Sequence, residues 1–479
     1  MSSGRRAKRP TRRPHRRRWY RSAWLPLVLL AGLLGGYVGA DIADAVPGVL
    51  TTRPEPIPDP PYPQQSNPAA PVVAVAGPDA GAAIPEPAQI ESLVATLLAD
   101  PLIGPGAGVL VSDVLTGTEL GAANADVAQT PASNTKLLTA AAAIATAGPD
   151  YRFRTTVVNG GDGQIVLVGG GDLALAAGAG DPGAIVGHAG VADLAAATAA
   201  ALQASGTTSV TLGLDTSYYA GPALAPRWDG PDLANGDAMA MTPLAIDVGR
   251  REGTRSRDTD AGGTTAAVFV QALTTAGITV TGQVQSVQAA TDATELAAVE
   301  SARLEDLAAD MLQRSENILA EGIGRLVAHQ LGMEPSFEGA GTAVGAALAD
   351  LGVDVGGLFL ADCAGLSSTN QISARTLVQT LLQIAARPSL ASVARGLPVA
   401  GLEGTLKDRF DGVGAGLVNA KTGTLYTVTA LSGYVRTADG RLLAFAVMAD
   451  NVPRGSTTGA RSAVDGFAQG LAACGCGSS

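Results

Sequence analysis

The sequence predicts an α/β (α+β) fold in which a smaller α/β domain is inserted into a larger one. Strand-like runs occur near both ends of the globular part, at Gly108–Leu115 and Leu442–Ala449, with helix-like runs between them. A separate alternation of short strand-like and helix-like runs, joined by Gly-rich loops, follows Phe153. Two such sets, one enclosed by the other, indicate an insertion.

Helices are expected where apolar residues recur every three or four positions, and Pro or Gly marks their ends. Pro131 suits the first turn of an alanine-rich helix that ends at Gly148. The other helix-like runs are Ile90–Leu98, Val191–Gln203, Thr265–Ala276, Leu304–Gln330, Ala374–Ala386 and a C-terminal run from Gly459. The other strand-like runs are Thr155–Val158, Gln164–Val168, Ser209–Leu214, Val418–Ala420 with the residues after it, and Leu431–Arg436.

Charge is distributed very unevenly along the chain. The first 22 residues hold ten of the 32 basic side chains and no acidic one, which leaves 22 basic against 43 acidic residues in the body. A strongly acidic body argues against a nucleic-acid partner.

The basic segment 1–22 precedes an uncharged stretch, Ala23–Ala40, which as a helix would rise about 27 Å, close to the thickness of a hydrocarbon core. Basic residues before it and acidic residues after it predict a cytoplasmic N-terminus and a single signal-anchor, with the body on the extracytoplasmic side of the membrane. The alternative is a cleaved signal peptide, since Val38–Ala40 and Ala43–Ala45 resemble cleavage sites. Recurrent prolines then predict an extended linker.

These observations divide the chain into six expected segments. They are a basic cytoplasmic tail at 1–22, a transmembrane signal-anchor at 23–40, a Pro-rich linker at 41–89, a first part of the larger domain at 90–152, the inserted domain at 153–258 and a second part of the larger domain at 259–479.

Lysine usage points to a site. The chain has four lysines against 28 arginines, so the rare lysines suggest chemistry that arginine cannot do. Ser133 and Lys136 lie three positions apart near a predicted helix start, where their side chains share a face and the lysine pKa is depressed. A serine nucleophile with a neutral lysine as its base is therefore predicted, because no convincing Ser-His-Asp triad is present.

Two further motifs follow in order. Ser315 and Asn317 form an S-x-N pair within a helical run, and Lys421-Thr422-Gly423-Thr424 begins a strand-like run. The ordered set S-x-x-K, S-D-N and K-T-G is typical of class A β-lactamases and penicillin-binding proteins. Lys421, Thr422 and Thr424 would form a clamp for a substrate carboxylate, because on a strand the two threonines share a face and Gly423 permits close approach.

On these motifs the chain resembles the D-alanyl-D-alanine carboxypeptidase/endopeptidase family, the low-molecular-mass class C penicillin-binding proteins. The resemblance extends over about residues 90–470, although Glu316 replaces the usual Asp and the insertion is short for the family. Further similar segments are Pro131–Leu137, Gly169–Asp172, Gly365–Ser367, Leu397–Gly401 and Gly404–Leu406.

The resemblance implies a penicillin-binding-protein-like catalytic domain and a cofactor-free serine D,D-peptidase. Its substrates would be peptidoglycan stem peptides, and β-lactams would acylate it. Ser133 would be the nucleophile and Lys136 its base, with Ser315 relaying a proton and Asn317 orienting Lys136. A β-lactamase-like hydrolase and a catalytically inactive wall-binding module are the alternatives; hydrolysis of a chromogenic cephalosporin would favour the first, and absence of penicillin labelling the second.

Cysteine use fits export, and a disulfide from Cys363 to Cys474 or Cys476 is expected. The two C-terminal cysteines are poor partners for each other, since a single residue between them forces a strained geometry. No metal site is expected, because three cysteines and three scattered histidines offer no ligand spacing.

Overall fold

The computed structural model describes residues 30, 34–38, 79–228, 230–251, 253–410 and 412–475. The chain divides into two compact units, 1–75 and 76–479, and the second carries the sheets and helices that follow. The predicted basic tail and most of both the predicted anchor and the predicted linker lie outside the described residues. Within the described part of the chain, no helix is both long enough and apolar enough to cross a bilayer.

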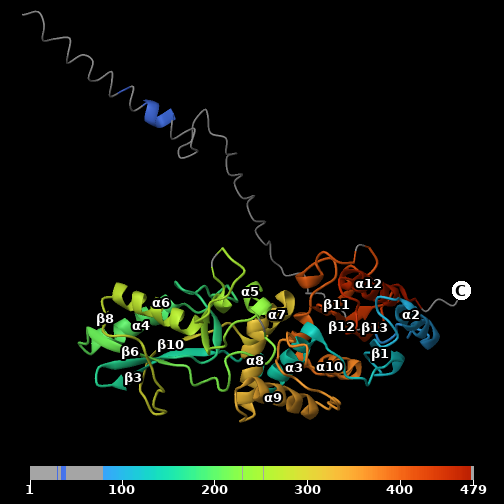
Figure 1. Ribbon diagram of the computed structural model, residues 1–479, viewed down its shortest axis with the longest axis horizontal. Helices are drawn as coiled ribbons and strands as arrows, with labels where there is room; N and C mark the ends of the chain where they lie inside the picture. Colours follow the sequence, from blue (N-terminus) through green and yellow to red (C-terminus); the bar gives the residue numbers. More distant parts are fainter. Residues whose placement is uncertain are drawn as a thin grey trace, which may run out of the picture. The chain divides into compact units, whose positions relative to one another are not determined.

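A five-stranded antiparallel sheet joins the two ends of the second unit, in the order β11-β12-β13-β1-β2 (Figure 1). Strand β1, early in the chain, pairs with β13 near its end, so that Val111 lies opposite Phe445. This pairing confirms the expectation that strands from both ends share one domain. The bounds are β1 Gly108–Asp113, β2 Glu119–Ala123, β11 Val418–Leu425, β12 Val428–Arg436 and β13 Leu442–Ala449.

Helices cover both faces of this sheet. Along β13, Phe445 and Val447 enter a core with α2 and α12, whereas Ala446 and Met448 enter a core with α3, α8, α9 and α10. The alternation follows from the opposite directions of successive strand side chains. The helix bounds are α2 Pro87–Ala99, α3 Thr135–Ala147, α7 Leu304–Arg314, α8 Asn317–Gln330, α9 Phe337–Asp350, α10 Ala374–Ala386, α11 Ala391–Arg395 and α12 Thr457–Ala473.

The predicted helix Leu304–Gln330 is two helices, α7 and α8. Ser315 takes a left-handed conformation with φ 57°, and Glu316 is extended and caps α8 by accepting a hydrogen bond from Ile318 N. The single-helix prediction is wrong here because the apolar periodicity runs through both helices. The break depends on long-range partners of Glu316, which the local pattern does not contain.

A second sheet has the order β10-β3-β4-β6-β8, with β9 also paired to β6, and packs against α4 and α6 around its own apolar core. Strands β5 and β7 form a small parallel pair. Figure 1 shows α8 between this part and the part that contains α3, and α8 contacts both α3 and β5. The bounds are β3 Arg154–Gly161, β4 Gln164–Val168, β5 Asp172–Leu175, α4 Val191–Ala204, β6 Ser209–Asp215, α5 Gly230–Asn235, β7 Leu244–Ile246, α6 Ala261–Thr275, β8 Thr279–Val280, β9 Gln285–Ser286 and β10 Glu295–Glu300.

The second sheet extends past the predicted end of the insertion at residue 258. Helix α6 and strands β8, β9 and β10 all follow that residue and belong to this sheet and its core. The prediction ended the insertion at the polar stretch 250–260, but that stretch leads into α6, whose Phe269 and Leu273 are buried under the second sheet. We therefore propose an insertion from about residue 153 to about residue 300, between the two parts of the larger domain.

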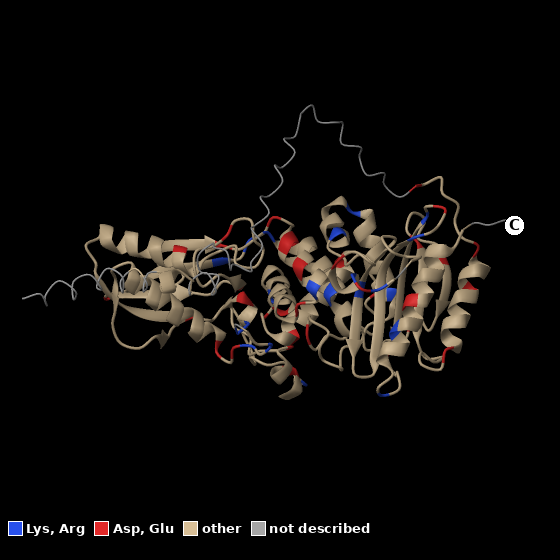
Figure 2. Cartoon of the chain, turned by 90° about the horizontal axis from the view of Figure 1, so that it is seen from above, with Lys and Arg blue, Asp and Glu red and all other residues tan. Residues whose placement is uncertain are grey.

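Acidic and basic positions are interspersed over both parts of the described chain (Figure 2). One ion pair, between Asp113 and Arg441, is buried beside β1 and β13. Arg441 Nη2 donates to Asp113 Oδ1 at 2.8 Å, and Nη1 donates to the carbonyls of Ala80 and Ala82 at 3.3 and 3.1 Å. One guanidinium thus joins the segment before α2 to the sheet.

We expect Arg441→Met to lower the free energy of unfolding by about 1–3 kcal/mol, because the Asp113 carboxylate loses its cationic partner but keeps its hydrogen bonds from Leu115 and Thr116. Adding Asp113→Asn should recover part of that loss. Urea unfolding followed by circular dichroism measures both changes. Equal stability of the Arg441→Met variant and the wild type would contradict a stabilising pair.

Candidate active site

Ser133 lies in a short 3₁₀ turn, Ala132–Asn134, directly before α3. Its side chain is partly accessible, whereas Asn134 and Lys136, which both follow it in the chain, are buried. Asn134 is fixed by the Ser432 hydroxyl, which donates to its Oδ1 at 2.5 Å. The turn therefore presents Ser133 from a rigid helix start.

Lys136 is fully buried and reaches Ser133, as the spacing predicted. Its Nζ lies 3.1 Å from Ser133 Oγ, 2.7 Å from Asn317 Oδ1 and 2.5 Å from the Ala364 carbonyl oxygen. Burial lowers the pKa of Lys136 to about 8, although the carboxylates of Asp362, Glu316, Glu321 and Asp237 partly oppose this. A substantial neutral fraction at mildly alkaline pH makes Lys136 a competent base toward Ser133.

The break between α7 and α8 presents the second motif. Ser315 has a left-handed conformation, and its hydroxyl oxygen accepts a hydrogen bond from Lys421 Nζ at 3.0 Å. Asn317, the first residue of α8, accepts from Lys136 and donates through Nδ2 to the Asp237 carbonyl at 2.8 Å. The two side chains thus contact the two different lysines of the site.

Strand β11 carries Lys421, Thr422, Gly423 and Thr424 at the edge of the five-stranded sheet. Lys421 Nζ also donates to the Thr422 carbonyl at 2.8 Å, and the Thr422 hydroxyl contacts the Thr405 hydroxyl at 2.9 Å. Burial, with Lys136 and Arg409 nearby, holds the pKa of Lys421 well below its usual value. Among the described residues no carboxylate pairs with Lys421, whose Nζ donates to the uncharged oxygens of Ser315 and Thr422.

Two glycines let separate elements meet at Ser133. A Cβ at Gly423 would lie 2.7 Å from the Pro131 carbonyl oxygen and from Asn134 Nδ2. At Gly365, where φ is +80°, a Cβ would lie 1.9 Å from the Ala132 carbonyl oxygen. Larger residues at either position would push β11 or the Gly365 loop away from the Ser133 turn.

The structure adds residues that the sequence did not assign. The Ala364 carbonyl contacts Lys136, and Glu321 Oε1 accepts from the amides of Cys363 and Ala364 at 2.7 and 2.8 Å. Glu321 is fully buried, and burial raises its pKa to about 7. A carboxylate one turn after Asn317, within an otherwise apolar helix, is the sequence feature from which Glu321 could have been predicted.

Of the two predicted pairings of Cys363, the one with Cys474 is not formed, and the one with Cys476 is not tested. Cys363 and Cys474 are both free thiols, and Cys476 lies outside the described residues. Cys363 belongs to the core beneath α3 and α8, whereas Cys474 packs against the core on the opposite face of the five-stranded sheet. The sheet therefore separates the two thiols.

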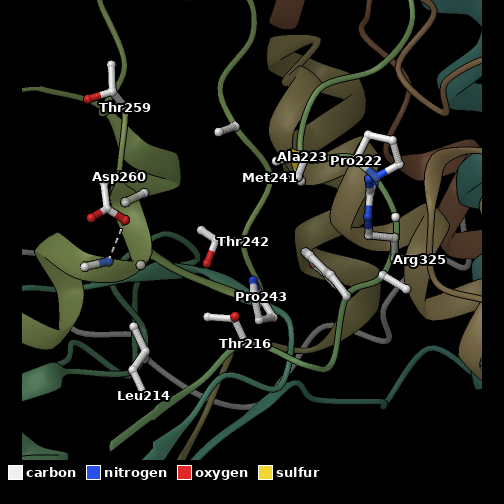
Figure 3. A pocket seen from close by; sticks show the side chains of 17 residues that line it. Leu214, Thr216, Pro222, Ala223, Met241, Thr242, Pro243, Thr259, Asp260 and Arg325 are labelled. Atoms are coloured by element: carbon white, nitrogen blue, oxygen red, sulfur yellow. Dashed lines mark hydrogen bonds between the residues drawn. The ribbon is translucent and has the colours of Figure 1, made fainter. Parts of the chain in front are cut away.

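A cavity of about 340 Å³ lies away from this site (Figure 3). It is lined by the loop 220–223, the segment 240–243 and the start of α6, with Arg325 of α8 at its side. None of the motif residues lines it.

An antiparallel sheet covered by helices on both faces, with a Ser-Lys pair at a helix start beside a K-T-G edge strand, defines a serine hydrolase of the penicillin-binding-protein fold. The chain belongs to the D-Ala-D-Ala carboxypeptidase 3 (S13) family, whose model matches residues 90–267 and 252–471. The resemblance, the fold class and the enzyme class expected from the sequence are thereby confirmed.

Relatives extend over most of the chain. A carboxypeptidase of Mycobacterium tuberculosis is 37% identical over 82% of this chain and 86% of its own length. Carboxypeptidase DacB of Mycolicibacterium smegmatis is 36% identical over 96% and 99%. The crystal structure of penicillin binding protein 4 from Haemophilus influenzae matches with a TM-score of 0.66 at 22% identity, covering 79% of this chain and 98% of that one, and shares the fold.

Thiol labelling checks the cysteine assignment. In protein that has not been reduced, we expect Cys474 to react with maleimide in the native state, because it is half-buried, and Cys363 to react only after unfolding. Peptide mapping of the labelled positions gives the result. A disulfide-linked peptide that contains Cys363 would contradict it.

Proposed function

We propose that the chain hydrolyses the bond between two D-alanine residues at the end of peptidoglycan stem peptides, through an acyl-enzyme on Ser133. The observation that carries this proposal is the contact of Lys136 Nζ with Ser133 Oγ at 3.1 Å, made by a buried amine whose pKa is lowered to about 8. Membership of the family supports the substrate class. Cleavage of D-alanine-containing cross-links is the second reaction that this site suits, since both substrates carry a carboxylate near the scissile amide.

In the proposed mechanism, Ser133 Oγ attacks the carbonyl carbon while its proton passes to neutral Lys136 Nζ. The N–H groups of Ser133 and Thr424 stabilise the oxyanion. When the C–N bond breaks, the Ser315 hydroxyl relays the proton to the leaving amine. Water then attacks the ester with the same base, releases the shortened peptide and restores Ser133. None of these steps requires a cofactor.

The proposed substrate clamp consists of Lys421, Thr422 and Thr424 on β11. Lys421 is buried, contacts Ser315 and lacks a carboxylate partner among the described residues, which supports a role in binding the terminal carboxylate. Binding of that anion would raise the pKa of Lys421, which burial lowers.

We further propose that residues 23–40 anchor the protein in the membrane and that the body acts on the extracytoplasmic side. The uncharged stretch and the basic residues before it support this proposal, and peptidoglycan lies in that compartment. Fractionation of membranes with intact and truncated chains tests it. Loss of residues 1–40 should release the protein into the soluble fraction.

Benzylpenicillin should acylate Ser133. Its strained amide presents a carbonyl and a carboxylate in the same relation as the terminal dipeptide, so the drug should use the same nucleophile and clamp. Mass spectrometry of digested protein locates the adduct. An adduct on another serine, or none on folded protein, would refute the mechanism, and rapid loss of the adduct would favour a β-lactamase.

Acylation should rise with pH up to about pH 8 and then level off, because Lys136 must be neutral and its pKa is lowered to about 8. Lys136→Arg keeps a cation but supplies no base, so it should acylate at least about 10²-fold more slowly. Stopped-flow acylation between pH 5.5 and 10 measures both effects. A flat profile in the wild type would remove Lys136 as the base.

A terminal carboxylate should be required in the substrate. We expect a diacyl-D-Ala-D-Ala peptide to exceed its C-terminal amide by about 10- to 200-fold in kcat/KM, the range for one charge-assisted hydrogen bond. Lys421→Ala should lose most of this preference. Equal cleavage of acid and amide by the wild type would rule out the clamp.

A further inference from the structure

Asn317 is held on both sides of its amide. Its Oδ1 accepts from Lys136 Nζ at 2.7 Å, and its Nδ2 donates to the Asp237 carbonyl oxygen at 2.8 Å. A carbonyl oxygen only accepts, so this second bond determines which end of the amide faces Lys136. Asp237 lies between α5 and β7, in the proposed insertion and far from α8 in sequence.

A single arginine joins the neighbours of these two residues. Arg257 Nε donates to the Gly236 carbonyl at 2.8 Å, and its Nη1 donates to the Val248 carbonyl at 2.6 Å. Its Nη2 donates to Glu316 Oε1 at 2.8 Å. Gly236 directly precedes Asp237, and Glu316 directly precedes Asn317, so Arg257 connects the chain on both sides of the Asp237–Asn317 hydrogen bond.

The Glu316 carboxylate accepts hydrogen bonds from other groups besides Arg257. Its carboxylate also accepts from Arg250 Nη2, and its Oε1 accepts from the amide of Ile318 at 3.2 Å, at the first turn of α8. The side chains of Glu316 and Arg257 are only 3% and 9% exposed, so solvent screens their ion pair little. The carboxylate therefore ties the start of α8 to two arginines of the insertion.

The length of the side chain matters for this arrangement. Glu316 stands where Asp is usual in the resembling family, and the extra methylene lets one carboxylate reach Arg250, Arg257 and the helix amide together. The Glu that replaces the usual Asp of the motif is therefore bound by two arginines of this chain, Arg250 and Arg257.

We propose that Arg257 and Glu316 are positioning residues that orient Asn317 toward Lys136, so that the insertion helps to set the geometry of acylation. This inference rests on the proposed roles of Ser133, Lys136 and Asn317. Neither Arg257 nor Glu316 needs to contact the substrate. Their effect passes through the Asp237 carbonyl and the first turn of α8.

Arg257→Lys is the direct test, because lysine keeps the charge but cannot serve three acceptors in three directions. Arg441→Lys is a matched control: Arg441 also binds one buried carboxylate and two backbone carbonyls, yet it lies beside β1 and β13. Both variants lose one buried guanidinium, so a general loss of stability affects them alike. Benzylpenicillin acylation is followed by stopped flow over drug concentration and pH, and the fraction of acylatable protein and the Tm are recorded for each.

We expect Arg257→Lys to lower the limiting acylation rate constant by at least about 10-fold with less than a threefold change in the apparent drug affinity. Its acid limb should move to lower pH, because the Asn317 oxygen favours the charged form of Lys136. Arg441→Lys should lower the Tm. Its limiting acylation rate constant should stay within twofold of the wild-type value, and the acid limb of its pH profile should not move. Glu316→Gln should show the same loss of acylation rate. Its pH profile is not compared, because the Glu316 charge itself raises the pKa of Lys136 and removing it would shift the profile directly.

Wild-type acylation kinetics in Arg257→Lys, or a defect no larger than that of Arg441→Lys, would overturn the inference. If Arg257→Lys does not fold, Glu316→Asp provides the same test, since it keeps the charge and shortens the reach by one methylene. A rate within twofold of wild type in folded Glu316→Asp would then overturn it. Absence of acylation in the wild type would refute the proposed function instead, so the two failures are distinguishable.

Discussion

The removal of Lys136 from water is the constraint on which the rest of the site depends. A lysine in solution is protonated at neutral pH and cannot accept a proton from serine. Burial brings its pKa to about 8, but a buried amine still needs hydrogen-bond partners. Ser133, Asn317 and the Ala364 carbonyl supply them from three separate segments, so the chemistry of one amine requires that these segments converge.

These segments can converge because their backbones approach closely at two glycines, Gly423 and Gly365. The absence of a side chain at Gly423 lets the edge strand β11 pack against the turn that carries Ser133, and Gly365 does the same for the loop that holds Lys136. Glu321 stabilises that loop by accepting its amides from within α8. The same helix carries Asn317 at its first residue, and one rigid element thus positions two partners of the lysine.

The motifs could be read from the sequence because they are local. A serine and a lysine three residues apart at a helix start must lie near each other, and alternate residues of a strand must share a face. The sheet that unites both ends of the second unit was also predictable, since strand-like runs occur near both of those ends. The break at Ser315, the continuation of the second sheet to β10 and the separation of Cys363 from Cys474 were not, because each depends on residues far apart in the chain.

The sequence by itself determined the fold class and the family, and it singled out Ser133, Lys136, Ser315, Asn317 and Lys421 as candidates, because short-range spacing and rare lysines carry that information. Only the tertiary structure decided what surrounds them. The contact of Ala364 is made by a backbone carbonyl, so no residue type in the sequence indicates it. Nothing in the sequence distinguishes Arg257 from the other 27 arginines; its role follows from its hydrogen bonds to Gly236, Val248 and Glu316 in the folded chain. Contacts of this kind arise from the packing of the insertion against α8, which no local pattern encodes.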